Sequence, residues 1–143
     1  MVYYTQKLNV KKGIMLKPYS TIDLGGRTLT VIPAAGHSED SIALYDKDNR
    51  ILFTGDFIYP AGLVLYTPGA DMSDCRATTK RLLATTDEET KLLCAHNGPK
   101  MERKALADLD GTLDAIRKGQ LKPENDFPFK RYNASKNFSL LTF

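Results

Sequence analysis

Three apolar runs of strand length each end in a residue that can bind a metal, and this pattern constrains the fold more than any other. The three residues are His37, Asp56 and His96, and each follows directly on a run rich in Val, Ile, Leu or Ala. If the runs are strands of one sheet that point the same way, the three side chains gather at its carboxyl edge, where open sheets bind ligands. Neutral imidazole and carboxylate suit a zinc-like divalent ion, and a carboxylate can bridge two ions.

Each of these residues also fits a structural role when it is taken singly. A histidine at a strand end is often a loop residue bonded to the backbone, and an aspartate after glycine often belongs to a turn. Gly36 and Gly55 precede His37 and Asp56, so the backbone can turn sharply there and bring the two side chains together. The repetition of one context at three strand ends favours a common site.

The rest of the chain predicts a mixture of short strands and two helices. Glycines 25 and 26 and the run 46–49 are turn residues that predict hairpins. Apolar residues at helical spacing predict a helix over 73–86, with Asp71 or Ser73 as N-cap, and a helix over 101–118 that ends at Gly119. β-Branched and apolar runs predict strands over 14–19, 21–24, 27–33, 41–45, 50–54 and 91–95, and a final strand against the sheet over 137–143.

The composition is that of an ordinary globular domain. The chain has 143 residues, 42% of them hydrophobic and 26% charged, which predicts a single domain over 1–143. It has no apolar run long enough to span a membrane and no signal-peptide pattern at its start, so we expect no membrane partner. Cys75 and Cys94 form no CxxC motif, which favours a reducing, cytoplasmic location. A net charge of +3 does not favour a nucleic-acid partner.

Several residues near the three strand ends have a secondary role in the expected site. Cys94 alternates away from the strand end and is interpreted as a buried structural thiol rather than a ligand. Residues 38–40 are expected to cap or orient the loop that carries His37. Tyr59 and Tyr66 either line a pocket or pack with a hydroxyl in contact with water. They belong to the segment 57–70, which is interpreted as a loop that shapes a substrate site.

Three segments in register carry a family resemblance. Residues 36–45 (GHSEDSIALY), 51–56 (ILFTGD) and 93–98 (LCAHNG) resemble the metallo-β-lactamase superfamily. The resemblance implies an αββα sandwich with one or two metals at the sheet edge, usually zinc, with iron or manganese also used. It implies that a metal-bound hydroxide attacks an ester, thioester, lactam or similar bond of a small-molecule substrate. By resemblance, His37 binds the first metal, Asp56 bridges both metals as the catalytic carboxylate, and His96 binds the second.

The sequence departs from the family at its leading signature. The HxHxDH motif of the first half is absent, and the chain has only two histidines. The resemblance therefore covers the C-terminal half of the fold. We expect an α+β chain that forms half of the sandwich, with one mainly antiparallel sheet packed by two helices. A catalytic zinc site needs about three protein ligands for each metal, so this chain by itself supplies an incomplete site.

Several hypotheses follow from the missing motif. The chain is a C-terminal half whose complementary N-terminal half carries the other ligands, or a natural half-fold that associates with itself, or a non-catalytic relative used for binding or assembly. Half of a sandwich leaves an apolar sheet face, which favours a homo-oligomer or a complementary half as partner. A nuclease-type relative is a further alternative, although a solvated tail also explains its basic residues, which are Lys118, Lys122, Lys130, Arg131 and Lys136.

Overall fold

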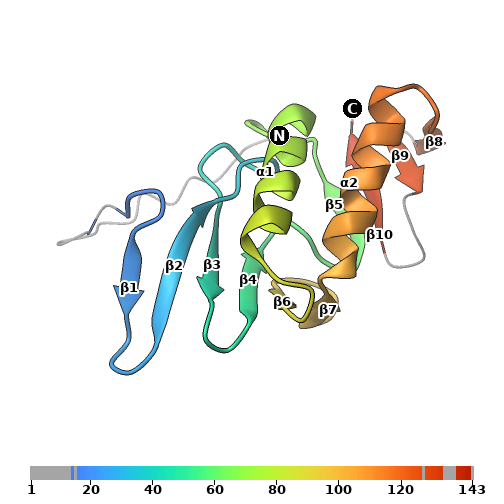
Figure 1. Ribbon diagram of the computed structural model, residues 1–143. Helices are drawn as coiled ribbons and strands as arrows, with labels where there is room; N and C mark the ends of the chain where they lie inside the picture. The colour runs from blue at the N-terminus through green and yellow to red at the C-terminus, as the bar shows by residue number, and fades with distance from the viewer. Residues whose placement is uncertain (1–13, 15, 127, 134–137, 143) are drawn as a thin grey trace.

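The computed structural model describes residues 14, 16–126, 128–133 and 138–142, and these form two helices and two β-sheets (Figure 1). The α+β class and the two helices of the sequence analysis are confirmed, with most strand pairs antiparallel. In chain order the elements are β1 (Thr21–Asp23), β2 (Thr28–Pro33), β3 (Ile42–Asp46), β4 (Ile51–Gly55), β5 (Ala61–Val64), α1 (Met72–Thr85), β6 (Lys91–Cys94), β7 (Lys100–Glu102), α2 (Lys104–Arg117), β8 (Glu124–Asp126), β9 (Phe129–Asn133) and β10 (Phe138–Thr142).

The larger sheet has six strands in the order β1-β2-β3-β4-β6-β7. Neighbouring strands are antiparallel except for β4 and β6, which are parallel. Since β2 and β4 are both antiparallel to β3, the strands β2, β4 and β6 all point the same way. Their carboxyl ends therefore meet at one edge of the sheet, which is the arrangement that the strand-end pattern requires.

The smaller sheet differs from the expectation of essentially one sheet. Its order is β5-β10-β9-β8, and Figure 1 shows it beside the larger sheet. The final strand, β10, was expected against the main sheet but pairs in parallel with β5, with Leu140 opposite Leu63. The strand β5 lies inside the segment 57–70 that the sequence analysis interpreted as a loop. Because this pairing joins segments far apart in the chain, no local pattern announces it.

Both helices lie where the sequence predicts them, with shifted ends. The N-cap of α1 is Asp71, whose carboxylate accepts a hydrogen bond from the Asp74 amide at 2.8 Å. Helix α2 begins at Lys104 rather than at residue 101, because Lys100–Glu102 pair with β6 as β7. It ends before Gly119, which has a φ of 69° as the predicted C-cap requires.

The predicted strand over 14–19 is wrong for the residues that the structure describes there. Pro18 has no N–H to donate to a strand ladder, and Tyr19 has a φ of 62°, so a turn forms in place of a strand. This segment still forms a hydrogen bond with β2, since the amide of Tyr19 donates to the carbonyl of Val31 at 2.8 Å. The other predicted strands of the larger sheet are present, and none of their ends is shifted by more than one residue.

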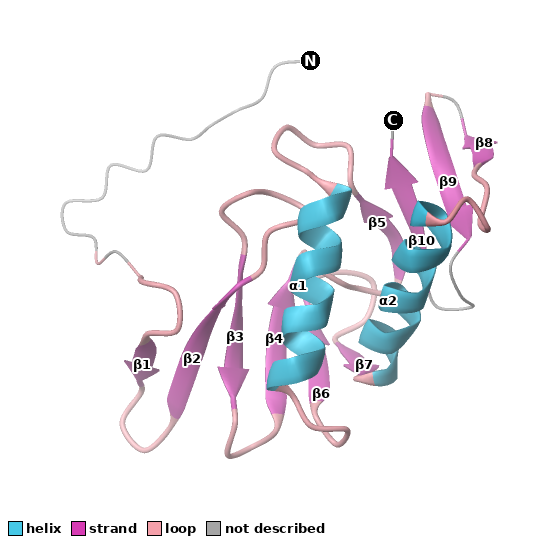
Figure 2. Ribbon diagram, turned by 45° about the horizontal axis from the view of Figure 1, so that its top comes forward, coloured by secondary structure: helices cyan, strands magenta, loops and turns pink. Residues whose placement is uncertain are grey.

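One hydrophobic core joins the helices to both sheets. Figure 2 shows α1 across the larger sheet and α2 beside the smaller one. The core includes Ile32 and Leu52 from the larger sheet, Leu82 and Leu109 from the helices, and Leu140 from β10, all fully buried. None of the described helices is long and apolar enough to cross a bilayer.

The other face of the larger sheet is also apolar. Register places Leu44 opposite Val31 and Phe53, and Phe53 opposite Leu93, so these side chains share one face. Leu44, Phe53 and Leu93 are half-buried and lie outside the core, and Ile42 on the same face is 41% exposed. Among the described residues, the surface formed by Ile42, Leu44, Phe53 and Leu93, which we call the outer face, is thus partly exposed, whereas Val31 beside Leu44 is buried.

Candidate metal centre

The loops after β2, β4 and β6 carry His37, Asp56 and His96 to the same edge of the larger sheet. The backbone joins two of these loops directly, since the amide of Ala95 donates to the carbonyl of Gly55 at 3.2 Å. Strand direction therefore places the three predicted residues at one edge of the sheet, where the described contacts join Asp56 to His96. Their role as metal ligands stays a prediction.

His37 has a defined ring orientation. Its Nδ1 lies 2.9 Å from the carbonyl oxygen of Val64, at the end of β5. A carbonyl only accepts hydrogen bonds, so Nδ1 must carry the proton and donate it. In the neutral ring Nε2 is then the unprotonated nitrogen. A histidine that binds a metal through one nitrogen usually donates its other N–H in this way.

Gly36 sets the position of this loop against α1. Its φ is +151°, and a Cβ built on it would lie 2.9 Å from the Cα of Cys75. The carbonyl of Gly36 accepts from the Asp71 amide at 3.0 Å, just before the helix begins. No side chain fits between loop and helix at this point, which explains why glycine precedes His37.

Hydrogen bonds within the loop hold its backbone. The Ser38 hydroxyl donates to Asp40 Oδ1 at 2.8 Å and lies 2.7 Å from the Ser41 hydroxyl. The hydroxyl of Thr67 donates to the His37 carbonyl at 2.8 Å, from the segment that follows β5. The predicted orienting role of residues 38–40 agrees with these contacts.

Asp56 and His96 form a pair. His96 Nε2 lies 2.9 Å from Asp56 Oδ1, and the two side chains are 57% and 44% exposed. The ring of Tyr59 meets the His96 ring edge-on, with 5.2 Å between centroids and 76° between planes. Tyr59 itself is buried, and this burial raises the pKa of its phenol, so the hydroxyl stays protonated at neutral pH.

A cleft of about 600 Å³ opens beside these residues. Its walls combine imidazole, carboxylate and hydroxyl groups with one apolar side, which suits a small polar substrate with an apolar part. The residues that line it are His37, Ser38, Ser41, Ile42, Thr54, Asp56, Thr67 and Pro68. His37 and Asp56 thus face a common space, and His96 reaches it only through its contact with Asp56.

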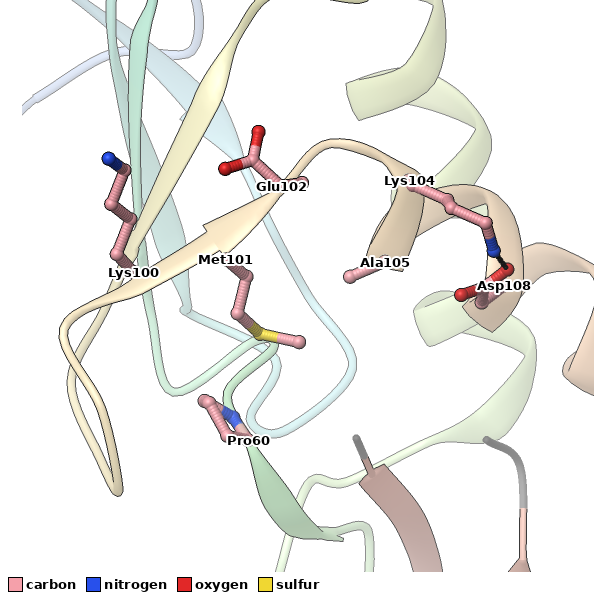
Figure 3. Close-up of a pocket in the computed structure, with 7 residues that line it drawn as sticks. All are labelled: Pro60, Lys100, Met101, Glu102, Lys104, Ala105 and Asp108. Carbon is pink, nitrogen blue, oxygen red and sulfur yellow. Dashed lines mark hydrogen bonds and ion pairs between the residues drawn. The ribbon is translucent and has the colours of Figure 1, made fainter. Parts of the chain in front are cut away.

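A second cavity, of about 690 Å³, contains neither histidine (Figure 3). Met101 and Pro60 form its apolar part, and the ion pair of Lys104 and Asp108 lies on its helix side. Although this cavity is larger, it has none of the three candidate ligands. The smaller cleft is therefore the better candidate for a reaction site, because its walls carry the groups with relevant chemistry.

The three residues fit part of a metal shell. Among the described residues, which include both histidines and both cysteines, no group of three or more His, Cys, Asp and Glu side chains could hold an ion. The Asp56–His96 pair and the prepared Nε2 of His37 are suitable donors at the same sheet edge. The described residues thus present a pair and a single donor rather than a closed site.

Other residues singled out by the sequence have structural contacts. Cys94 is half-buried, and burial raises the pKa of its thiol, although a hydrogen bond with Thr54 opposes the shift. Tyr66 stacks on Phe129 with 4.1 Å between ring centroids. Of the late basic residues, Lys118 pairs with Asp114 at 2.6 Å. Lys136 lies outside the described residues.

Two contributors to the site were not found from the sequence. The carbonyl of Val64 orients His37, and the hydroxyl of Tyr59 contacts the strand that carries this carbonyl. A backbone acceptor has no residue signature, so no motif could have indicated Val64. The sequence predicts either a pocket wall or a packing role for Tyr59, and its contact with β5 depends on the fold.

Comparison with known proteins gives a consistent result. The family model described as the metallo-beta-lactamase superfamily matches residues 4–96. Acyl-coenzyme A thioesterase MBLAC2 from Homo sapiens is 41% identical over 78 residues, which are 54% of this chain and 28% of that protein. Hydroxyacylglutathione hydrolase from Hyphomonas neptunium is 33% identical over 81 residues, which are 57% of this chain and 31% of that protein. The chain thus spans less than a third of either relative.

Solved structures share the fold. A metallo-beta-lactamase from Pontibacter korlensis superposes with a TM-score of 0.58 at 24% identity, covering 69% of this chain and 47% of that one. ETHE1 from Myxococcus xanthus superposes with a TM-score of 0.61 at 18% identity, covering 70% of this chain and 45% of that one. In both cases the matched part is less than half of the solved protein.

Proposed function

The chain belongs to the metallo-β-lactamase superfamily, and on that premise we propose that it supplies His37, Asp56 and His96 to the metal centre of a hydrolase. The observation that carries the proposal is the hydrogen bond from His37 Nδ1 to the Val64 carbonyl. This bond leaves Nε2 unprotonated in the neutral ring, which is the state that a metal ligand needs. The convergence of β2, β4 and β6 supports the same conclusion.

Each residue has a distinct part in the proposed centre. His37 offers a neutral nitrogen from one side of the cleft, and Asp56 offers a carboxylate that faces both the cleft and His96. These residues would hold a divalent metal, with zinc as the first expectation and iron or manganese as alternatives, and the metal would supply activation of water and polarisation of the scissile bond. The hydroxyl of Ser41 lines the same cleft and can orient a polar substrate there.

The proposed substrate is a small acyl thioester. A relative that is 41% identical over the matched segment is named an acyl-coenzyme A thioesterase. Esters and lactams remain the alternatives within the same chemistry, since each has a polarisable carbonyl. The apolar side of the cleft, formed by Ile42 and Pro68, supports a substrate with a hydrocarbon part.

The remaining ligands of the proposed centre come from a partner. With two histidines and one paired carboxylate, the part of the chain that the structure describes lacks the ligands that a closed zinc site needs. We propose that a complementary half of the fold, or a second copy of the chain, contributes them across the outer face. Activity of the chain by itself is then expected to be low or absent.

Metal analysis tests the ligand assignment. Protein dialysed against zinc, and in parallel against manganese or iron, is analysed for bound metal by elemental analysis. Because the ligand shell is incomplete, we expect weak binding, with metal above background in the wild type and loss of it in His37→Ala, Asp56→Ala and His96→Ala. Asp48→Ala is the matched control, since Asp48 is an exposed turn residue. If the wild type contains no more metal than the background, and the variants contain the same amount, this chain has no metal site.

Thioester hydrolysis tests the reaction. Release of coenzyme A from an acyl-coenzyme A is followed with a thiol reagent, for the chain alone and with an HxHxDH-bearing half added. We expect zinc-dependent release in the mixture that falls at least tenfold in Asp56→Ala and is unchanged in Asp48→Ala. Release that is independent of Asp56, or absent from a mixture that binds zinc, would contradict the thioesterase proposal.

A second candidate function is self-association as an assembly module, and the outer face favours it. Leu44, Phe53 and Leu93 form a contiguous apolar surface that a second sheet could cover, because paired sheets pack face to face. Light scattering across a range of concentrations tests this function. We expect a dimer that Phe53→Asp converts to a monomer, with Leu24→Asp, an exposed leucine in a turn, as control. A stable wild-type monomer would rule the module out.

A further inference from the structure

Tyr59 occupies a position between the two histidines. It follows β4 by four residues and is 5% exposed, so its ring belongs to the hydrophobic core. Its hydroxyl donates to the carbonyl of Gly62 at 3.1 Å and accepts from the amide of Val64 at 3.3 Å. Both partners are on β5, the strand at the end of the smaller sheet.

The open edge of β5 is the surface that this hydroxyl meets. On its other edge β5 pairs with β10, where the Leu65 amide just beyond the strand donates to the carbonyl of Leu141 at 2.8 Å. Within a strand, the N–H and C=O of one residue point to the same edge. The Val64 amide bonds to Tyr59 and the Val64 carbonyl bonds to His37, so the phenol and the imidazole lie side by side along one edge.

The ring of Tyr59 meets the second histidine. Its contact with His96 is edge-on, at 5.2 Å between centroids. His96 is more than half exposed, and among the described contacts its ring meets only Asp56 and Tyr59. A ring packed in the core therefore supports an exposed ring on a loop.

We propose that Tyr59 is a positioning residue that sets both imidazoles, its hydroxyl through the β5 edge that orients His37 and its ring through direct contact with His96. The inference rests on the proposed function only in taking the two imidazoles to be metal ligands. The contacts that position them are present in the protein without metal. The hydroxyl holds the Val64 peptide in the orientation that presents its carbonyl to His37, and the aromatic ring limits where His96 can lie.

The test uses nitrogen-15 NMR of the imidazole rings in metal-free protein at about pH 8.5, where an ordinary histidine is neutral. Because the chain has two histidines, His37→Gln and His96→Gln each assign the signals of the other ring. We expect the Nδ1–H tautomer for His37 in the wild type. Tyr59→Phe should give a mixture of His37 tautomers with little change at His96. Tyr59→Leu should also shift the ring-proton signals of His96.

Tyr45→Phe is the matched control. Tyr45 is equally buried, at 4% exposure, and its hydroxyl lies 3.4 Å from the Thr90 hydroxyl, near the opposite end of the sheet. This variant removes the same atom from the same core and should leave both imidazoles unchanged. Backbone amide spectra establish whether each variant is folded. If Tyr59→Leu does not fold, Tyr59→Phe still tests the role of the hydroxyl, because this variant retains the packed ring.

Two results would overturn the inference. One is a wild-type His37 that is not the Nδ1–H tautomer, and the other is a folded Tyr59→Phe with His37 unchanged. Zinc titration separates this inference from the proposed function. If the wild type binds zinc, Tyr59→Phe should weaken binding about tenfold, as loss of a supporting contact does. If the wild type binds none, the proposed function fails, while the tautomer result still decides the role of Tyr59.

Discussion

The Nδ1 atom of His37 lies 2.9 Å from the carbonyl oxygen of Val64, and this contact joins the two sheets of the protein. His37 follows β2 in the larger sheet, whereas Val64 ends β5 in the smaller one. The orientation of one candidate ligand therefore depends on a strand that does not belong to the sheet carrying it. Substitutions that destabilise the smaller sheet should therefore change the orientation of the His37 ring.

Gly36→Ala is expected to destabilise the protein by about 1–3 kcal/mol, from a strained φ and from a clash with the backbone of α1. The added Cβ would lie 2.9 Å from the Cα of Cys75 and 3.2 Å from the ring of Phe57. Urea unfolding measures the change. Gly111→Ala is the matched control: Gly111 is exposed in α2 with nothing within 4 Å, so alanine there should stabilise by about 0.5–1 kcal/mol. Equal effects of the two substitutions would contradict the close approach at Gly36.

Leu140→Ala should destabilise by about 2–5 kcal/mol, the usual cost of removing a buried leucine side chain. Leu140 is fully buried in β10, opposite Leu63. Leu24→Ala, at a position 58% exposed, should change stability by no more than about 0.5 kcal/mol. The free energy of unfolding in urea provides the comparison. If Leu140→Ala were as mild as Leu24→Ala, the packing of β10 against the core would be wrong.

Asp46 should make the protein sensitive to acid. Burial raises the pKa of its carboxyl, but hydrogen bonds from Arg27 and Asn49 outweigh burial, so the pKa lies below the ordinary 3.8. A carboxyl with a lowered folded pKa contributes stability that is present above the unfolded pKa and is lost as the pH falls through the folded one. Asp46→Asn should therefore lower the free energy of unfolding at neutral pH. It should also make that free energy decrease less as the pH falls below about 4.

Unfolding midpoints at a series of pH values measure this effect. Asp48→Asn, in the same turn but exposed, should keep the wild-type pH profile. Asp114, whose pKa is lowered by Lys118 and Arg117, keeps its own contribution in every variant. A pH profile of Asp46→Asn that is parallel to that of the wild type would show that Asp46 is not the titrating group.

The two thiols should differ in reactivity. Cys75 is 1% exposed, and burial raises its pKa to about 12, so it carries almost no thiolate at neutral pH. Cys94 is half-buried, so a thiol reagent reaches its sulfur more easily than that of Cys75. With an aromatic disulfide reagent, Cys94→Ser should react only as fast as the protein unfolds, and Cys75→Ser should react faster. Fast labelling of Cys94→Ser in the folded state would contradict the burial of Cys75.

Much of the larger sheet and both helices could be predicted because their signals are local. Turn residues such as Gly25 and Asp48 act on the few residues around them, and helical spacing is visible within α2 alone. The convergence of His37, Asp56 and His96 was also predictable in outline, since each follows a strand and strands of one direction share an edge. The predicted strand over 14–19 was wrong because Pro18 and Tyr19 favour a turn.

The sequence by itself determined which groups carry chemistry and at which strand ends they lie, since residue type and strand length are properties of short segments. Only the tertiary structure decided that β10 pairs with β5 in a second sheet. It also decided that the carbonyl of Val64 orients His37 and that the ring of Tyr59 contacts His96. These are long-range contacts, two of them to backbone atoms that every residue has. Their formation depends on how the whole core packs, so no short pattern records them.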